Sequence, residues 1–505
     1  MMRQSRIKGT RLKIIGFFAV LLVALFLFGR GERPRYPFVY DDPSKSDPAA
    51  LIDREALLKD INYLVALIDE SHPDPYNFIS RSDFQTRADQ MKDHILAFSS
   101  DSIQRIDCYY YLQKLVATLQ DEHTVFKFQD KWLKNYPKRF PLELRVIDGR
   151  VFIGDTRNDY GIPQNTELLV INGRPVSWLL SEFMQLMNQT LLHYKYQIIE
   201  ENFDRLLQTY ADMTPPWHII YRHDEHEYSA EILGIARDEP TPGANTGDLY
   251  TESLLEVDEK TVPILEIPRF YYPDKAAFEA FIDGFFRRHY DKEYLVIDLR
   301  RNPGGDGRWA FFVLDYLTDK PYLLYKRFDF KISQTFVAAT RYFQHKEYYN
   351  KLIPRFLWRF AAPWVRDDYW WDKINQASVG EYAEDHDVSR IPDSDKTKFR
   401  GKVLLLISHR TNSAAVVFSA IFKYNNLGVV LGRETGGRIG FTSDPIFIEM
   451  PHSHIRMSLP VAILELPGEN TNRGVIPDIH VPKRIEDSHY GVDIDLEKVK
   501  ELIRE

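Results

Sequence analysis

The chain has 505 residues, and 44% of them are hydrophobic, which is enough for two or three domains with substantial cores. Its formal charge is −8 at pH 7, and no long run of Lys and Arg follows the first few residues, which excludes the basic footprint typical of nucleic-acid binding. Cys108 is the only cysteine, so an intrachain disulfide framework and a thiolate metal cluster are both excluded.

The N-terminus carries five basic residues followed by an unbroken apolar run at residues 14–29. This order is typical of an export signal, so residues 1–30 are predicted to be a signal peptide or a membrane anchor, with residues 31–505 on the periplasmic side. The run is shorter than the ~20 residues of a comfortable membrane-spanning helix, but its exit lacks an A-x-A-like cleavage site. The first observation favours a signal peptide and the second an uncleaved anchor. Residues 31–50, rich in Pro and polar residues, are predicted to be a linker.

Residues 51–135 are predicted to be an N-terminal helical module. Apolar positions recur at helical spacing over residues 54–70, 82–97 and 103–119. The last helix runs into a short acidic turn that carries His123. An imidazole has an ordinary pKa of about 6.5, so it is mostly neutral at pH 7 and can act as a general base.

Residues 136–235 are predicted to be a β domain, because short strand patterns alternate with turns there. Residues 167–176 and the helix that follows resemble the strand, turn and helix of PDZ domains; the alternative is an unrelated small β-barrel or hairpin. Residues 223–227, His-Asp-Glu-His-Glu, lie between strand patterns and are predicted to be a polar hairpin turn rather than a metal site.

From residue 250 to 485 strands and helices alternate, which favours an α/β core in which helices cover a sheet. Residues 320–400, rich in Tyr, Trp and Phe, are predicted to be an insertion without assignable elements, and residues 486–505 a C-terminal helix. The clearest elements of the core are residues 262–267, 275–286, 294–299, 308–317, 402–407, 414–423 and 429–432.

The strand at residues 402–407 runs through a polar turn directly into the helix that begins at Ala414. This geometry presents Ser413 beside the free N–H groups of a helix start, where a serine can be a nucleophile. The alternative is that Thr411, Asn412 or Ser413 caps the helix.

Glycine-rich turns follow two other core strands. Asn302-Pro303-Gly304-Gly305 has backbone N–H groups that can approach a ligand closely, although glycines after a strand also simply let the chain reverse. A second glycine-dense turn covers residues 432–440.

Taken together, these segments resemble the serine peptidase family that includes the tail-specific (C-terminal-processing) proteases and the tricorn core protease. The resemblance implies a crotonase-like core of stacked ββα units, with Ser413 as the nucleophile and an oxyanion held by the N–H of Ala414 and of Gly304 or Gly305. It rests on five short motifs in family order: Asp121-x-His123-Thr124, Asp298-Leu-Arg-x-Asn302-Pro-Gly-Gly305, Thr411-x-Ser413-Ala414-Ala415, Gly432-x-x-Thr435-x-Gly437 and Gly474-Val-x-Pro477-Asp478.

The resemblance also bears on the base. Tail-specific members use a lysine at the position of Arg438, and arginine cannot accept a proton at ordinary pH, so a Ser–Lys dyad is excluded. Tricorn-like members use the histidine at the position of His123, oriented by a glutamate. The expected glutamate position is Thr471 here, which leaves Glu469, Glu122 or no carboxylate as the third member.

The turn that carries Arg438, together with Thr435 and Gly437, is expected to contact substrate; the alternative for Arg438 is a solvated turn arginine. No H-E-x-x-H or comparable ligand spacing occurs, which disfavours a metal hydrolase. We therefore expect an exported serine endopeptidase that needs no metal or other cofactor and acts on peptides or unfolded proteins. The alternative is a weak or inactive relative that binds extended peptides.

Overall fold

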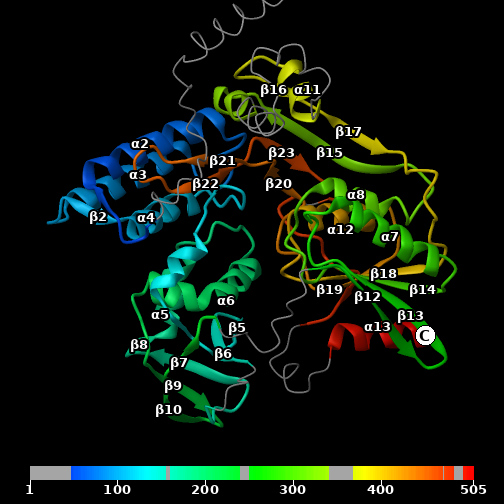
Figure 1. The fold of residues 1–505 in the computed structure, drawn as a ribbon, viewed down its shortest axis with the longest axis horizontal. Coiled ribbons are helices and arrows are strands. Elements are labelled where there is room, and N and C mark those ends of the chain that lie inside the picture. The colour runs from blue at the N-terminus through cyan, green and yellow to red at the C-terminus, as the bar shows by residue number, and fades with distance from the viewer. Residues whose placement is uncertain (1–46, 155–159, 239–248, 341–367, 470, 483–492) are drawn as a thin grey trace, which may run out of the picture. The chain divides into compact units, whose positions relative to one another are not determined.

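The computed structural model describes residues 47–154, 160–238, 249–340, 368–469, 471–482 and 493–505 (Figure 1). All of them belong to one compact unit, Val39–Glu505. No helix within these residues is both long enough and apolar enough to cross a membrane. The apolar run at residues 14–29 lies outside them.

Three helices lie within residues 51–135, which the sequence predicts to be a helical module. Helices α2 (Arg54–Ser71), α3 (Arg81–Leu96) and α4 (Arg105–Ala117) lie close to the expected ranges, and a 3₁₀ helix follows at Asp130–Asn135. Helix α4 begins two residues later than expected, because β2 (Ser102–Gln104) pairs antiparallel with β1 (Leu51–Asp53). Beyond α4, β3 (Val125–Phe126) pairs with a strand in the C-terminal part of the chain.

The predicted β domain contains a sheet with the order β10-β9-β7-β6-β5, and β8 pairs with β7. The tight turn at Asp148 and Gly149 joins β5 to β6, and the polar turn at Asp224 and Glu225 joins β9 to β10, as the sequence predicts for a hairpin. The PDZ-like assignment stays a prediction. The elements are β5 (Leu144–Ile147), β6 (Arg150–Ile153), β7 (Thr166–Ile171), β8 (Arg174–Pro175), α5 (Val176–Met184), α6 (Leu192–Thr209), β9 (Trp217–His223) and β10 (His226–Ile232), and β4 (Lys138–Arg139) pairs with β11 (Ile235–Ala236).

A second sheet forms the core, with the order β12-β13-β14-β18-β19-β24. All neighbours in it are parallel except β12 and β13. Its strands are β12 (Thr251–Val257), β13 (Lys260–Glu266), β14 (Tyr294–Asp298), β18 (Lys402–Ile407), β19 (Val429–Gly432) and β24 (Ile479–His480). The sequence-predicted bounds of β18 and β19 are matched to the residue.

The side chains of this sheet alternate between two apolar clusters, as the two-residue period of a strand requires. Leu295, Ile297 and Leu405 pack with α7 (Lys275–His289), α8 (Gly307–Leu314) and α12 (Ala414–Tyr424). Val296 and Leu404 point the other way and pack with α13 (Ile494–Arg504). Figure 1 shows the first three helices on one side of these strands and α13 on the other. The mixed α/β fold predicted from sequence is therefore confirmed.

Two further sheets lie beside the core. One has the order β16-β15-β23-β20 with β17 on β15, and the other the order β21-β22-β3. Residues 320–400, for which the sequence assigned no elements, contain β15, which is the central strand of the first of these sheets. The elements are β15 (Tyr322–Lys331), α11 (Asp368–Gln376), β16 (Tyr382–Ala383), β17 (His386–Arg390), β20 (Gly440–Ser443), β21 (Ile446–Glu449), β22 (Arg456–Leu459) and β23 (Ala462–Glu465).

Candidate active site

Ser413 occupies the sharp turn between β18 and α12. Its backbone has φ 48° and ψ −119°, a combination that costs a non-glycine residue strain and marks the strand-to-helix turn that exposes a nucleophile. Although Ser413 stands at the N-cap position, its side chain makes no capping hydrogen bond. Ser413 is therefore not a simple helix cap, and its hydroxyl is available to another partner.

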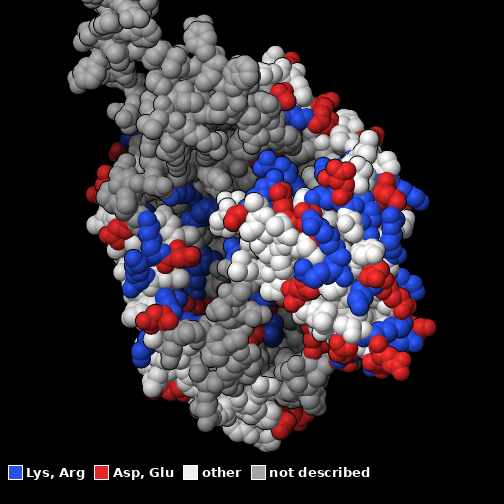
Figure 2. Space-filling view, turned by 45° about the vertical axis from the view of Figure 1, so that its right-hand side comes forward, with Lys and Arg blue, Asp and Glu red and all other residues white. Residues whose placement is uncertain are grey.

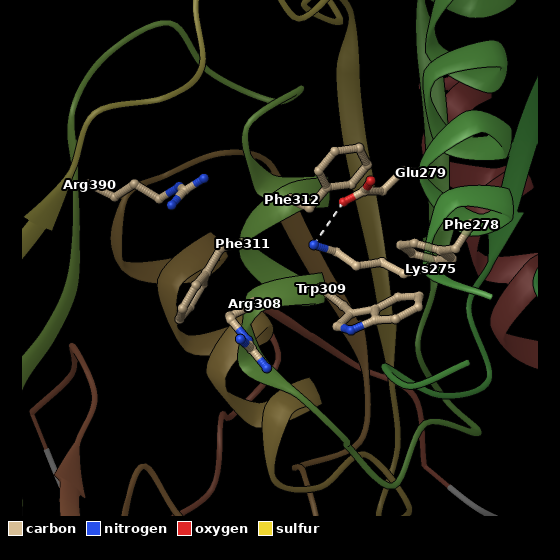
Figure 3. A pocket seen from close by; sticks show the side chains of 8 residues that line it. All are labelled: Lys275, Phe278, Glu279, Arg308, Trp309, Phe311, Phe312 and Arg390. Carbon is tan, nitrogen blue, oxygen red and sulfur yellow. Dashed lines mark ion pairs between the residues drawn. The ribbon is translucent and has the colours of Figure 1, made fainter. Parts of the chain in front are cut away.

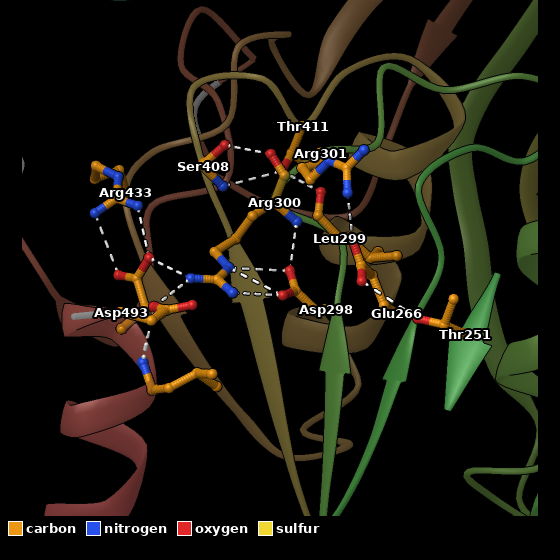
Figure 4. Close-up of polar contacts among 12 residues, drawn as sticks. Thr251, Glu266, Asp298, Leu299, Arg300, Arg301, Ser408, Thr411, Arg433 and Asp493 are labelled. Carbon is orange, nitrogen blue, oxygen red and sulfur yellow. Dashed lines mark hydrogen bonds and ion pairs between the residues drawn. The ribbon is translucent and has the colours of Figure 1, made fainter. Parts of the chain in front are cut away.

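The polar side chains behind this turn tie it to the end of the neighbouring strand (Figure 4). The hydroxyl of Thr411 donates to the carbonyl of Leu299 at 2.9 Å, and the hydroxyl of Ser408 donates to the carbonyl of Arg300 at 2.6 Å. Arg300 is itself held by Asp298 at 2.6 Å and by Asp493, next to α13, at 2.6 Å. The carboxylates around Arg300 raise the pKa of its guanidinium against the lowering effect of burial. These hydrogen bonds and ion pairs thus hold the strained turn in place.

The glycine turn after β14 lies against the serine. A methyl group on Gly304, whose φ is +109°, would stand 2.6 Å from Ser413 Cβ and 3.0 Å from the nitrogen of Ala414. The N–H of Gly304 already donates to Asn302 Oδ1 at 2.8 Å. Among the described residues no acceptor bonds the N–H of Gly305 or of Ala414. These two N–H groups are the donors that remain for a ligand beside Ser413.

His123 reaches the serine from the turn that follows α4. Its Nε2 lies 3.4 Å from Ser413 Oγ, although 290 residues separate the two in the chain. The ring stacks on Phe441 with centroids 5.7 Å apart and an interplanar angle of 18°. Burial lowers the pKa of His123, and Asp121 opposes that shift. A neutral imidazole at this distance is placed to accept the hydroxyl proton.

Among the described residues, no carboxylate bonds to the other ring nitrogen of His123. Nδ1 is buried and makes no hydrogen bond within the described residues, although the backbone of Thr442 raises the pKa of the ring. Glu469 is exposed, and no hydrogen bond or ion pair between described residues joins it to His123. The structure therefore brings Ser413 and His123 together but does not bring Glu469 to them.

Asp121 fixes the backbone of the histidine turn instead of the ring. Its Oδ1 accepts the N–H groups of His123 and Thr124 at 2.8 and 2.9 Å. Its Oδ2 contacts His72 Nε2 at 3.1 Å and accepts the hydroxyl of Thr442. Burial alone would raise the pKa of Asp121, but these partners outweigh it and hold the pKa well below its usual range.

Glu122, which is partly buried, and Arg438, which is buried, lie beside the site. Burial raises the pKa of Glu122 to about 8, against the lowering effects of Arg438 and of a hydrogen bond with Asn412. Only 8% of Arg438 is exposed; its Nη1 donates to Asn472 Oδ1 at 3.1 Å, and its guanidinium lies 4.7 Å from the ring centroid of Phe78. Arg438 is therefore no solvated turn arginine.

Thr435 and Gly437 shape the turn that carries Arg438. The hydroxyl of Thr435 donates to the carbonyl of Gly437 at 2.9 Å and accepts the N–H of Val475 at 2.7 Å. A methyl group on Gly437 would clash with Asn412 Oδ1. The contacts of these two residues are internal, and their expected role in substrate contact stays a prediction.

Two hollows lie on the described surface away from Ser413. One, of about 270 Å³, is lined by aromatic rings and paired cations of α7 and α8 and contains none of the site residues (Figure 3). The other, of about 560 Å³, begins at Val125, two residues beyond His123, and continues along β5 and α6. Among the described residues no group of three or more His, Cys, Asp or Glu side chains is arranged to hold a metal ion. Figure 2 shows basic and acidic side chains interspersed over the described part of one face.

The chain was compared with models of known protein families. Residues 261–481 match peptidase family S41. The chain carries an S41 peptidase domain. The S41 match includes Ser413, Gly304 and Gly305, whereas His123 precedes it by more than a hundred residues. The protein is therefore a serine-type peptidase whose substrates are peptides or proteins.

Solved structures resemble this chain over most of its length. Mature CPAF is 17% identical with a TM-score of 0.64, covering 89% of this chain and 97% of that one. CPAF complexed with lactacystin is 18% identical with a TM-score of 0.63, covering 89% and 98%. The photosystem II D1 C-terminal processing protease is 13% identical with a TM-score of 0.40, covering 88% and 98%. At 17–18% identity the first two show a shared fold, and no match was found among curated proteins.

Several site residues had no signal in the sequence. Asn412 belongs to the serine turn, but nothing in its neighbourhood indicates that it bonds Glu122 and Tyr194. His72 and Thr442, which hold Asp121, come from a helix end and a strand 370 residues apart. Only the spatial arrangement reveals them.

Proposed function

We propose that the protein is an exported serine endopeptidase in which Ser413 is the nucleophile and His123 the general base. The observation that carries this proposal is the 3.4 Å approach of His123 Nε2 to Ser413 Oγ. Catalytic hydrogen bonds of free enzymes are commonly longer than the about 2.6–3.2 Å of the working complex. The strained backbone of Ser413 and its unused capping position support the same role.

In the first step His123 Nε2 takes the proton of Ser413 Oγ while Oγ bonds to the peptide carbonyl carbon. The carbonyl oxygen becomes an oxyanion, for which the N–H groups of Ala414 and Gly305 are the available donors. The C–N bond then breaks, and His123 gives its proton to the leaving amine. Water repeats the sequence on the acyl-enzyme, which releases the acid and restores Ser413.

The histidine is oriented by its backbone and its ring face in place of a carboxylate. Asp121 holds the turn, Phe441 supports the ring, and the hydroxyl of Ser458 donates to the carbonyl of His123 at 2.7 Å. An imidazolium formed during the reaction has no carboxylate at Nδ1 to stabilise it within the described residues. Enzymes that lack this partner are slower but retain chemistry, so we expect a slow peptidase.

The same unpartnered Nδ1 favours one alternative function. A chain that binds extended peptides and cleaves none has no need to stabilise an imidazolium. The hollow of about 560 Å³ beside β3, away from Ser413, offers room for a bound peptide. Covalent chemistry at Ser413 separates the two functions.

The decisive experiment treats purified residues 31–505 with a fluorophosphonate probe and measures cleavage of unfolded casein. We expect one labelled site, lost in Ser413→Ala, and labelling slowed by at least about 100-fold in His123→Gln. Ser419→Ala is the matched control, because Ser419 lies on the same helix, where its hydroxyl donates to the carbonyl of Ala415.

Labelling that persists in Ser413→Ala would remove the nucleophile from this proposal. Absence of labelling from the wild type between pH 6 and 9, together with measurable peptide binding, would favour the peptide-binding alternative. Full activity in His123→Gln would assign the base elsewhere.

Export rests on the basic and apolar order of residues 1–30. Full-length protein produced in a bacterium with two membranes should be digested by external protease after the outer membrane is opened. The version that starts at residue 31 should stay protected in the cytoplasm. Equal protection of both would contradict the export proposal.

A further inference from the structure

A short segment, residues 188–194, leads into α6 and contacts both turns that carry Ser413 and His123. At its beginning, the side-chain amide of Asn188 donates to the carbonyl of Asp121 at 2.7 Å and to that of Thr124 at 3.2 Å. The hydroxyl of Thr190 donates to the carbonyl of Gln120 at 3.1 Å. Three carbonyls of the His123 turn are thus fixed by residues 188–190.

The end of the same segment contacts the serine turn. The side-chain amide of Asn412, the residue before Ser413, donates to the hydroxyl of Tyr194 at 2.9 Å. Only 5% of Tyr194 is exposed, and its ring fills the space next to Gly436, where a methyl group would stand 2.7 Å away.

Two more residues of α6 extend this contact. His193 Nε2 lies 3.0 Å from the carbonyl of Thr435, and its ring centroid lies 4.4 Å from that of His409. Farther along the helix, Glu201 pairs with Arg410 at 2.9 Å. The serine turn therefore rests on the helix at several points, and Tyr194 contacts the residue nearest to Ser413.

We propose that residues 188–194 set the distance between His123 and Ser413, and that Tyr194 is a positioning residue that acts through Asn412. The inference rests on the proposed function of Ser413 and His123. The two turns are 290 residues apart, and each bonds separately to a segment seven residues long. Because proton transfer requires a heavy-atom distance near 3 Å, a small shift of either turn changes the rate steeply.

Asn412 links Tyr194 to the proposed nucleophile, because it bonds to Tyr194 and directly precedes Ser413 in the chain. Its side chain shares hydrogen bonds with Tyr194 and Glu122, and its backbone N–H donates to the carbonyl of Asn302 at 3.0 Å. Without the Tyr194 hydroxyl, Asn412 keeps only the partners on the other side of the turn. The turn then relaxes and Ser413 Oγ moves relative to His123.

The test compares Tyr194→Phe with Tyr196→Phe, which removes a hydroxyl from the same helix on the side near Gly149 of the β domain. We expect Tyr194→Phe to lower kcat and the fluorophosphonate labelling rate by about tenfold, with KM and Tm unchanged, and Tyr196→Phe to change neither rate. In the double variant with Asn412→Ala the loss should not exceed that of Asn412→Ala alone, because both act through one contact.

Wild-type kcat and labelling in Tyr194→Phe would overturn the proposal, and so would equal losses in Tyr196→Phe. If Tyr194→Phe does not fold, Asn188→Ala decides: a lowered kcat at unchanged KM supports the proposal, and wild-type rates overturn it. Ser413→Ala, measured beside these variants, separates this failure from that of the proposed function, since persistent labelling in Ser413→Ala overturns the function itself.

Discussion

The two turns that meet at the site are built differently. The serine turn is fixed from behind by Thr411 and Ser408, and its strain is held in place by packing against Gly304. The histidine turn is fixed through its backbone by Asp121, while the ring keeps an unpartnered buried Nδ1 among the described residues. The contacts of the serine turn fix its position. The contacts of the histidine turn fix its position too, but among the described residues they leave Nδ1 of the ring without a hydrogen-bond partner.

This difference indicates which contribution limits the rate of peptide cleavage that we propose. A rigid nucleophile turn with two free N–H donors supplies positioning and oxyanion stabilisation, which are commonly the largest catalytic contributions. The charge of Asp121 and the backbone of Thr442 favour the charged imidazole, but within the described residues no carboxylate bonds to its Nδ1. Variants of the serine side should therefore have larger effects than variants around the histidine.

The largest effect is expected for Gly304→Ala. The added methyl group would stand 2.6 Å from Ser413 Cβ, and φ of +109° disfavours any side chain, so kcat/KM should fall by at least about 100-fold. Gly380→Ala is the control, because Gly380 has φ of +99° with no atom within 4 Å of an added methyl group. It should lose about 1 kcal/mol of stability and no activity. Equal activity of the two variants would show that Gly304 does not shape the site.

Asp121→Asn should come next, with a fall in kcat of about tenfold. An amide nitrogen in place of Oδ2 would face two donors, His72 Nε2 and the hydroxyl of Thr442, so the turn that carries His123 would shift. Steady-state kinetics on one peptide substrate measures the change. Asp93→Asn, at an exposed position of α3, serves as the control and should be neutral. An unchanged kcat in Asp121→Asn would mean that the ring stacking alone positions the base.

Glu122→Gln tests the partly buried carboxyl of the histidine turn by its pH dependence. The folded protein holds the Glu122 proton up to a pKa of about 8, whereas the unfolded chain releases it near 4.5, so this group lowers stability as the pH rises through that window. Glutamine does not titrate. The variant should gain about 1–2 kcal/mol in unfolding free energy over the wild type between pH 5 and pH 9.

Urea unfolding at both pH values measures that gain. Glu225→Gln, in the exposed β9–β10 turn, provides a matched control with no pH-dependent difference. Parallel wild-type and Glu122→Gln stabilities across the window would show that Glu122 is ionised in the folded protein.

Glu469→Gln should have the smallest effect, less than about twofold in kcat/KM. The residue is exposed and no bond between described residues joins it to His123, so its charge should contribute little. A tenfold loss would instead identify Glu469 as the orienting carboxylate of the working enzyme. That result would make the two halves of the site electrostatically equivalent.

Much of the core could be predicted because its signals are local. The strand at 402–407 is a continuous buried apolar run flanked by polar residues, which is typical of a parallel strand covered on both faces. By contrast, β15 carries Lys326, Arg327 and Asp329, which break the apolar pattern. Arg327 pairs with Asp329 and with Glu465 of β23, a partner that only the folded chain supplies.

The site divides in the same way. Ser413, His123 and the glycine turn could be predicted because each belongs to a short pattern of residues. The burial of Arg438 could not, because a charged residue in a turn is ordinarily solvated, whereas here Phe78 and Asn472 from distant parts of the chain cover and bind it. The contacts of Asn188 and Tyr194 with the two turns could not be predicted either, since an amide and a phenol near the start of a helix are common in proteins.

The pairing of β3 with β22 has a consequence for the order in which the protein is made. Val125 and Phe126, which begin two residues after His123, pair with Ser458 and Met457, which leave the ribosome more than 300 residues later. Domains fold as units as synthesis proceeds, so the histidine turn waits for its strand partner while the nascent chain grows. Ser413 and His123 can therefore be aligned only after most of the chain has been synthesised.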